Sequence, residues 1–123
     1  MERGKPQGFA GGVGSQMELL IPNSLAFRDY LNTHSHERAE VEFLESVLEE
    51  GMNVLDIGAN AGVTTMAIAK RVGKSGKLFS FEPVPEYFDI LKKNISSNGL
   101  ENVKAYELAV TDQVGRVEVT LPP

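Results

Sequence analysis

The sequence predicts an α/β fold of three layers, in which a parallel sheet lies between two layers of helices. Helix-like and strand-like segments alternate along most of the chain, and such alternation implies right-handed crossovers between parallel strands. At 123 residues, the chain is long enough for one domain with its own hydrophobic core. We expect three parallel strands in the order 3-2-1 and then a β-hairpin, with the sequence truncated before a fourth parallel strand.

Glycines dominate the beginning of the chain. Four of them fall between Gly8 and Gly14, and no strand-like run precedes them. Residues 1–16 therefore predict a flexible glycine-rich leader rather than a phosphate-binding loop, and residues 17–123 form the expected domain. Within that domain, the apolar run Met17–Ile21 is a candidate edge strand, because Pro22-Asn23 ends it.

Three segments have apolar residues at helical spacing. In the first, Val41, Leu44 and Leu48 recur on one face while glutamates occupy the others. In the third, Pro85 suits the first position of a helix, and Asn98-Gly99 suits its end. Helices are therefore expected over Glu37–Glu49, over Val63–Val72, and from Pro85 to Asn98-Gly99.

Short apolar runs between and after these helices predict strands over Asn53–Ile57, Lys77–Phe81 and Val103–Tyr106. Two alternating runs follow, at Glu107–Val110 and Arg116–Leu121, on either side of Asp112-Gln113-Val114-Gly115. A turn sequence between two alternating runs is typical of a β-hairpin, which completes the expected fold.

The composition excludes several kinds of site and partner. With 12 basic and 17 acidic residues the net charge is −5, which argues against strong nucleic-acid binding. The chain has no cysteine, and His34 and His36 lack a third ligand, so we expect no disulfide and no metal site. No apolar run is long enough to span a bilayer and no secretory signal is present, so we expect a cytoplasmic protein without membrane association.

A glycine-containing turn joins the first predicted strand to the second helix, with the sequence Asp56-Ile57-Gly58-Ala59-Asn60-Ala61-Gly62. Gly58 and Gly62 suit a backbone that has positive φ or lies against a ligand. The helix that begins after Gly62 offers free N–H groups to a carboxylate, and Asp56 at the strand end can engage an ammonium. A ligand with both groups is an amino acid, and S-adenosylmethionine contains one.

A second carboxylate, Glu82, ends the next strand. An acidic residue at this place in a Rossmann-like unit accepts hydrogen bonds from both hydroxyls of a ribose. Asp56 and Glu82 at consecutive strand ends therefore indicate an amino acid joined to a ribose. Taken singly, each residue also has a structural interpretation: Gly58 and Gly62 as packing glycines, Asp56 as a turn residue, Glu82 as a solvated strand end, and Asn60 as an Asx turn.

These segments resemble the FkbM-type family of class I, Rossmann-like methyltransferases. The run from Asp56 to Gly62 is similar to the family's D-(V/I/L)-G-A-N-x-G, and the run from Phe81 to Phe88 is similar to its F-E-P-x-P-x-x-F. Ala109-Val110-Thr111-Asp112 with Gly115 resembles a later A-(V/L)-(S/T)-D-x-x-G element. The resemblance covers roughly residues 37–121, most of the chain.

The resemblance implies a pocket for S-adenosyl-L-methionine, whose residues would be Asp56, Gly58, Ala59, Asn60, Gly62, Glu82, Pro83 and Ala109. Pro83 would shape the ribose side. Backbone groups near Ala109 would contact the adenine, because the aspartate that many class I methyltransferases have there is absent. The family's acidic K-x-D-x-E-G motif near the transferred methyl has no match in this chain, so no catalytic residue is assigned.

The leading hypothesis is an enzyme, an S-adenosylmethionine-dependent methyltransferase that acts on oxygen of a small molecule or glycan. Two alternatives stay open: a catalytically incomplete cofactor-binding or assembly module, and an NAD-dependent oxidoreductase. The glycine spacing differs from G-x-G-x-x-G, and Asp56 would repel a pyrophosphate, which disfavours the oxidoreductase.

Without a fourth strand, the predicted strand Asn53–Ile57 would have an open edge. An apolar edge of this kind is a template for pairing with another chain. We therefore expect a homodimer through this edge, unless the run Met17–Ile21 folds back and covers it within one chain.

Overall fold

The structure is a computed structural model of the chain, and it describes residues 7–9, 17–19 and 36–120. Its strands are β1 (Gln7–Phe9), β2 (Met17–Leu19), β3 (Asn53–Ile57), β4 (Lys77–Phe81) and β5 (Val103–Tyr106), and its helices are α2 (His36–Val47), α3 (Val63–Val72) and α4 (Pro85–Ser97). The bounds of β3, β4, β5 and α3 are those that the sequence predicted. The helix α2 ends at Val47, two residues before the predicted Glu49.

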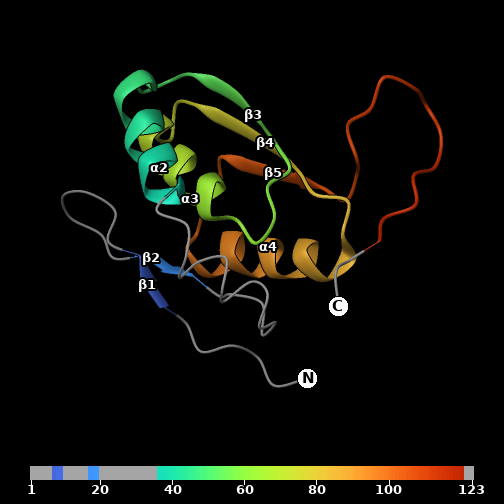
Figure 1. Cartoon of the computed structure of the whole chain (residues 1–123). Coiled ribbons are helices and arrows are strands. Elements are labelled where there is room, and N and C mark those ends of the chain that lie inside the picture. Colours follow the sequence, from blue (N-terminus) through green and yellow to red (C-terminus); the bar gives the residue numbers. More distant parts are fainter. Residues whose placement is uncertain (1–6, 10–16, 20–35, 121–123) are drawn as a thin grey trace.

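The strands β3, β4 and β5 form one parallel sheet in the order β3-β4-β5 (Figure 1). This confirms the predicted order 3-2-1. Each crossover is made by one helix, α3 between β3 and β4 and α4 between β4 and β5. Because the strands are parallel, their carboxyl ends meet at one end of the sheet, where Ile57, Phe81 and Tyr106 lie side by side.

One face of the sheet packs against all three described helices. Val54, Leu78 and Val103 are neighbours across the strands on this face. The core cluster there draws its buried members from α3, β4, β5 and the residue after α2: Leu48, Ile68, Ala69, Val72, Leu78 and Val103. A second cluster joins Phe88 and Leu91 of α4 to Ala59, with Ala105 packed against it. Burial of these apolar side chains on one face is what holds the helices to the sheet.

The opposite face of the sheet carries Leu55, Ile57, Phe79, Phe81 and Tyr106, and we call it the bare face. Leu55 and Ile57 are 63% and 59% exposed, and Phe81 stacks on Tyr106 with ring centroids 5.3 Å apart. These side chains alternate along each strand with the buried ones. The described residues therefore form one of the two expected helix layers, since α2, α3 and α4 all lie on the face of Val54.

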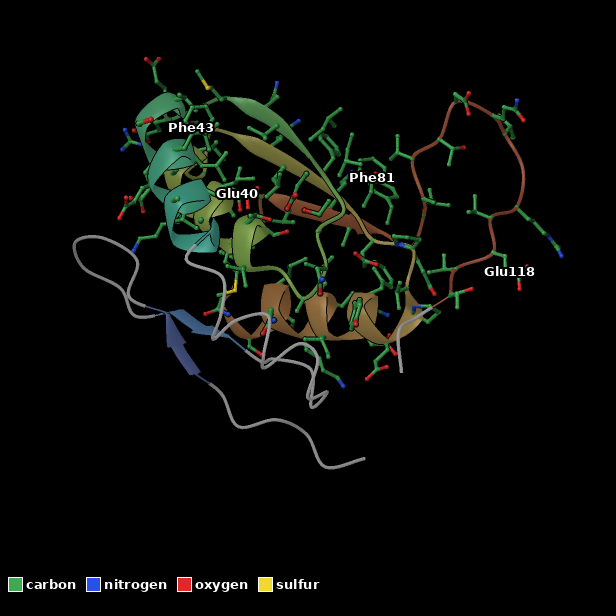
Figure 2. The ribbon with its side chains drawn as sticks, viewed as in Figure 1. Glu40, Phe43, Phe81 and Glu118 are labelled. Atoms are coloured by element: carbon green, nitrogen blue, oxygen red, sulfur yellow. The ribbon has the colours of Figure 1, made fainter. Side chains whose placement is uncertain are left out.

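The predicted C-terminal hairpin is wrong for the part that the structure describes. Residues 107–120 contain no strand and are exposed throughout, and Leu121 lies outside the described residues. Figure 2 shows this segment, with Glu118, projecting away from the sheet. An alternating pattern alone does not hold a hairpin together, because a lone hairpin is marginal unless one face packs against a core. The Thr111 hydroxyl instead closes a local turn by donating to the Gln113 carbonyl at 2.6 Å.

The two short N-terminal strands, β1 and β2, pair antiparallel with each other. The candidate strand Met17–Ile21 is confirmed over Met17–Leu19, but it pairs with β1 and does not fold back to cover β3. β1 falls within the predicted leader, and the rest of residues 1–16 lies outside the described residues. The outer edge of β3 therefore has no strand partner in the part of the chain that the structure describes.

Membrane-spanning helices and metal-binding clusters are both absent from the described ranges. None of the helices there has the length and apolar character needed to cross a membrane. No group of three or more His, Cys, Asp or Glu side chains there could hold a metal ion. His34 lies outside the described residues.

Candidate cofactor-binding site at the strand ends

The candidate site lies where β3 and β4 end and where the loop Gly58–Gly62 leads into α3. Gly58 and Gly62 have φ angles of 80° and 107°, in the left-handed region that the sequence pattern predicted. A Cβ atom on Gly62 would come within 2.9 Å of the Leu91 Cδ1 atom on α4. The backbone angle therefore favours glycine at position 62, and a Cβ atom there would also displace the buried Leu91 side chain.

Asp56 is the first of two buried carboxylates in the site, and it is only 8% exposed. The Thr65 hydroxyl donates to its Oδ2 at 2.6 Å, and the Thr64 hydroxyl lies 3.2 Å from the same oxygen. Burial raises the pKa of Asp56 above its usual range, and the hydroxyls of Thr65 and Thr64 oppose that rise. Two donors from the first turn of α3 thus hold this carboxylate in a fixed direction.

Ser80 extends this polar cluster into the core. Its hydroxyl lies 3.2 Å from the Thr65 hydroxyl, and both residues are completely buried. Because a threonine hydroxyl has one hydrogen, which Thr65 gives to Asp56, Ser80 must be the donor to Thr65. Sequence reasoning missed Thr64, Thr65 and Ser80. The available signal was the parallel register, which pairs Asp56 with Ser80.

The second buried carboxylate is Glu82, which is 4% exposed. Its Oε2 accepts the Asn60 N–H at 2.7 Å, and its Oε1 accepts the Val84 N–H at 2.9 Å. Each carboxylate oxygen has two lone pairs, so each can accept one further hydrogen bond. Glu82 is therefore not the solvated strand end of the structural interpretation.

Hydrogen bonds from three consecutive N–H groups join the glycine-containing loop to the end of β4. Those of Gly58 and Ala59 both donate to the Phe81 carbonyl at 2.9 Å, and that of Asn60 donates to Glu82. Asn60 has a φ angle of 52°, and its Oδ1 accepts the Ala61 N–H at 2.7 Å. This bond reaches the next residue, whereas an Asx turn would reach the N–H two residues on.

The helix α4 contacts the same loop through a hydrogen bond and through apolar packing. The buried Asn94 side chain donates through Nδ2 to the Ala61 carbonyl at 2.7 Å. Ala59 is 3% exposed and packs against Phe88 and Leu91, so its side chain belongs to the core. The sequence did not predict the bond from Asn94, because it depends on how α4 crosses the sheet.

The N-terminus of α3 has free N–H groups, as the sequence predicted. The N–H of Met66 donates to the Gly62 carbonyl, the first bond of the helix. The three preceding N–H groups, those of Val63, Thr64 and Thr65, have no hydrogen-bond partner among the described residues. Free N–H groups at a helix start, with the dipole behind them, attract a carboxylate.

The structure brings together seven of the eight predicted site residues, Asp56, Gly58, Ala59, Asn60, Gly62, Glu82 and Pro83. The eighth, Ala109, is exposed on the segment after β5, and no hydrogen bond among the described residues joins it to the others. The predicted contact of its backbone with adenine stays a prediction.

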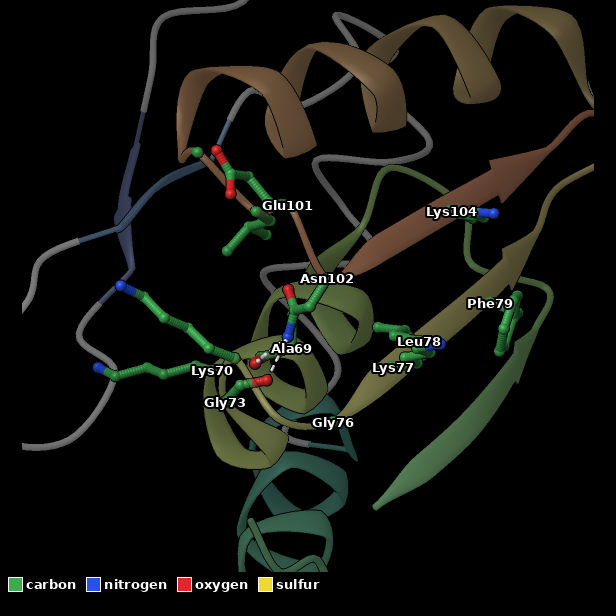
Figure 3. Close-up of a pocket in the computed structure, with 13 residues that line it drawn as sticks. Ala69, Lys70, Gly73, Gly76, Lys77, Leu78, Phe79, Glu101, Asn102 and Lys104 are labelled. Atoms are coloured by element: carbon green, nitrogen blue, oxygen red, sulfur yellow. Dashed lines mark hydrogen bonds between the residues drawn. The ribbon is translucent and has the colours of Figure 1, made fainter. Parts of the chain in front are cut away.

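A cavity of about 670 Å³ lies at the other end of the sheet, beside the amino ends of β4 and β5 (Figure 3). Lys70, Lys74, Lys77 and Lys104 line it, together with Asn102. The Asn102 amide donates to the carbonyls of Ala69 and Gly73, at 3.0 and 2.9 Å, and so caps the end of α3. Lys70 and Lys74 lie near the C-terminus of α3 and complement its dipole, so their presence does not by itself indicate a ligand.

Residues 20–114 match the family described as protein-L-isoaspartate(D-aspartate) O-methyltransferase. The chain belongs to this family. A relative from Methanococcus maripaludis, a protein-L-isoaspartate O-methyltransferase, is 42% identical over 57 residues, which is 46% of this chain and 27% of the relative. One of the same description from Archaeoglobus fulgidus is 45% identical over 56 residues, 46% of this chain and 26% of the relative. One from Caenorhabditis elegans is 23% identical over 95 residues, 77% of this chain and 42% of the relative.

Solved structures agree on the fold. A SAM-dependent methyltransferase from Aquifex aeolicus has a TM-score of 0.50 and 27% identity, over 63% of this chain and 39% of that one. An rRNA methylase from Streptococcus thermophilus has a TM-score of 0.51 and 21% identity, over 58% of this chain and 41% of that one. The expectation of a Rossmann-like methyltransferase fold is therefore confirmed.

The matched stretches span between about a quarter and two fifths of the length of the curated relatives named above. The family that matches is also not the FkbM-type family that the motifs resembled.

Proposed function

We propose that this chain forms the S-adenosylmethionine-binding part of an O-methyltransferase whose acceptor is the carboxylate of an L-isoaspartyl residue in a protein. The observation that carries the proposal is the pair of buried carboxylates, Asp56 and Glu82, at adjacent strand ends beside the free N–H groups of α3. The family membership and the SAM-dependent relative from Aquifex aeolicus support the cofactor and the reaction class.

The donor set of the site fits this cofactor group by group. Asp56 offers a negative charge to the ammonium, and the N–H groups of Val63, Thr64 and Thr65 offer hydrogen bonds to the carboxylate of the same amino acid. Glu82 has two remaining lone pairs, one on each oxygen, for the two ribose hydroxyls. Charge and hydrogen-bonding capacity are thus complementary along the ligand.

S-adenosylmethionine supplies an electrophilic methyl group. An acceptor carboxylate oxygen forms the new C–O bond while the methyl–sulfur bond breaks, which gives a methyl ester and S-adenosylhomocysteine. A carboxylate is already ionised at neutral pH, so no base has to remove a proton. What the reaction requires of the protein is alignment of acceptor and sulfonium, and the fixed carboxylates and loop of this site serve that positioning.

A small-molecule or glycan acceptor of the FkbM type is the second candidate, and it rests on the motif resemblance. It differs chemically, because a hydroxyl acceptor must lose a proton during transfer. Incubation with labelled S-adenosylmethionine and either an isoaspartyl peptide or its normal aspartyl counterpart separates the candidates. Label on the isoaspartyl peptide alone supports the protein acceptor, and binding without transfer supports the cofactor-binding module.

The cofactor assignment predicts a specific effect of Asp56→Asn. This variant keeps the shape and the hydrogen bond from Thr65 but removes the charge that faces the ammonium. A hydrogen bond to a charged group is worth about 1.5–3 kcal/mol, so calorimetry should show S-adenosylhomocysteine binding weakened about tenfold or more.

Three controls accompany this titration. Asp112→Asn, an exposed acid on the segment after β5, should leave the affinity unchanged. A 2′-deoxy analogue should bind the unaltered chain more weakly, because it lacks one hydroxyl for Glu82. A folded chain that binds neither S-adenosylhomocysteine nor adenosine, or one that prefers NAD, would overturn the assignment.

A further inference from the structure

The Glu82 carboxylate connects three segments that are separate in sequence. It follows β4 directly, it accepts the Asn60 N–H from the loop after β3, and it accepts the Val84 N–H at the start of α4. Its own N–H donates to the Tyr106 carbonyl at 3.0 Å, which continues the parallel pairing of β4 with β5. We call Glu82 with its two N–H partners the Glu82 clamp.

The loop residue held by the clamp is in an unfavourable backbone conformation. Asn60, with φ of 52°, is the one non-glycine residue with positive φ in the described ranges. The left-handed region costs an ordinary L-residue about 1–2 kcal/mol, and asparagine less, because its side chain can bond locally. Something must therefore hold Asn60 there, and its N–H is bonded to a charged acceptor at 2.7 Å, which is the stronger class of hydrogen bond.

Burial makes this bond hard to replace. Glu82 is 4% exposed, so water cannot readily satisfy the Asn60 and Val84 N–H groups if the carboxylate is lost. The neighbouring N–H groups of Gly58 and Ala59 donate to the Phe81 carbonyl, and these two bonds do not involve Asn60. The hydrogen bond of the Asn60 N–H thus depends on a single side chain, that of Glu82.

We propose that Glu82 is a positioning residue that sets the left-handed conformation of the glycine-containing loop before any ligand binds. The inference rests on the proposed function only where it concerns the ribose. There Glu82 acts on two sides at once, with one lone pair of each oxygen holding the protein and the other receiving a ribose hydroxyl. Loop shape and ribose recognition are then properties of the same carboxylate.

Amide hydrogen exchange of the ligand-free chain tests the clamp directly. In Glu82→Gln the side chain keeps its shape, but its single carbonyl oxygen can satisfy one N–H while its NH₂ group faces the other. We expect protection of the Asn60 and Val84 amides to fall about tenfold or more, as loss of a charged hydrogen bond implies. Glu101→Gln removes the same charge at the exposed opposite end of the sheet and should leave both amides protected. Unchanged protection in Glu82→Gln would overturn the proposal.

A pair of substitutions at Asn60 provides a second test and a safeguard against misfolding. Asn60→Gly and Asn60→Ala both remove the bond from Oδ1 to the Ala61 N–H, and they differ in how well they tolerate positive φ. If Glu82 holds that angle, Glu82→Gln lowers the folding equilibrium constant less with alanine than with glycine at position 60, by up to about tenfold, because the alanine loop relaxes from its strained angle once the bond is lost. Equal effects in both backgrounds would show that Glu82 does not set the conformation. If Glu82→Gln alone fails to fold, rescue by Asn60→Gly supports the clamp and failure of that rescue counts against it.

Failure of the clamp and failure of the proposed cofactor are distinguishable. Both measurements above use ligand-free protein, whereas the cofactor is tested by S-adenosylhomocysteine binding to the unaltered chain. Lost amide protection in Glu82→Gln, together with no binding by the unaltered chain, would retain the clamp and reject the cofactor. Normal binding by the unaltered chain with unchanged protection in Glu82→Gln would retain the cofactor and reject the clamp.

Discussion

At the scale of single residues, the site is built from polar side chains that are buried and fully partnered. Among the described residues, no buried side-chain nitrogen or oxygen lacks a hydrogen bond. Asp56 and Glu82 carry the charge, and Thr65, Ser80 and Asn94 are completely buried around them. Buried polar groups are costly unless satisfied, so removal of one partner affects the stability of the whole site.

Thr65→Val should destabilise the fold in a pH-dependent manner. Because the pKa of Asp56 is raised in the folded chain, ionisation of Asp56 lowers the free energy of unfolding as pH rises from the usual aspartate pKa of 3.8 through the higher folded pKa. Thr65 opposes this shift, so its loss extends the decline to higher pH. We expect a deficit of about 1.5–3 kcal/mol at neutral pH that shrinks in acid, where Asp56 is protonated in both variants.

Urea denaturation at neutral pH and near pH 4 measures this deficit. Thr65→Ser keeps the hydroxyl and should restore most of the neutral-pH stability. A deficit of the same size at both pH values would mean that Thr65 acts through packing alone.

Gly62→Ala should destabilise the fold more than Gly58→Ala. Both glycines have positive φ, so both substitutions carry the backbone cost of about 1–2 kcal/mol. A Cβ atom at Gly62 would also lie 2.9 Å from Leu91 Cδ1, whereas at Gly58 nothing lies within 4 Å. Thermal unfolding of the two variants measures the difference, and equal losses would show that α4 yields freely at Leu91.

The sequence also allowed the charged and glycine positions of the site to be predicted, but not their partners. Asp56, Gly62 and Glu82 stand at strand ends and turns, where their residue types have few explanations. From the sequence alone, Thr65 and Ser80 are ordinary helix and strand residues. Their hydrogen bonding around Asp56 follows from the register, which places Ser80 beside Asp56. Hydrogen bonds between distant segments are a property of packing that a local pattern does not contain.

At the scale of elements, the parallel strands were predictable and the hairpin was not. Each of β3, β4 and β5 is a short apolar run with a helix before or after it, so pattern and packing agree. The runs Glu107–Val110 and Arg116–Leu121 have the alternation of strands but no core to pack on, and the described part of them is exposed. Alternation predicts which face a strand would bury, and it does not provide the surface that covers it.

Asn94→Ala should loosen the contact between α4 and the loop. The substitution removes the donor to the Ala61 carbonyl at 2.7 Å and leaves that buried acceptor without its side-chain partner. We expect a loss of about 1–3 kcal/mol in the free energy of unfolding, measured by urea denaturation. Lys93→Ala, on the exposed side of α4, should change stability little. If the two variants lose the same stability, the bond from Asn94 does not join α4 to the loop.

At the scale of the whole molecule, the sheet has a covered face, a bare face and a free edge at β3 in the described part. Leu55 lies on the bare face of that edge strand and is 63% exposed. An apolar edge without a partner is a template for pairing with a second copy. We therefore expect the chain to self-associate through β3.

Light scattering at micromolar concentration should show a dimer that Leu55→Lys converts to monomer, since a charge on an edge strand blocks pairing. Val114→Lys, on the exposed segment after β5, adds the same charge and should leave the dimer intact. A monomer for the unaltered chain would contradict the expectation.

The order of the sheet has a consequence for how the chain folds. Each strand pairs with the strand next to it in sequence, joined by a single helix, so no contact of the sheet closes a loop longer than one crossover. Residues that pair in the sheet are still a whole crossover apart in sequence, and parallel pairing of this kind forms slowly, because chain entropy is lost before the contacts form. The units β3-α3-β4 and β4-α4-β5 share β4, and Glu82 at its end bonds to residues of both. The bonds of this carboxylate form only when both halves are in place, so it should be among the last groups to become ordered during refolding.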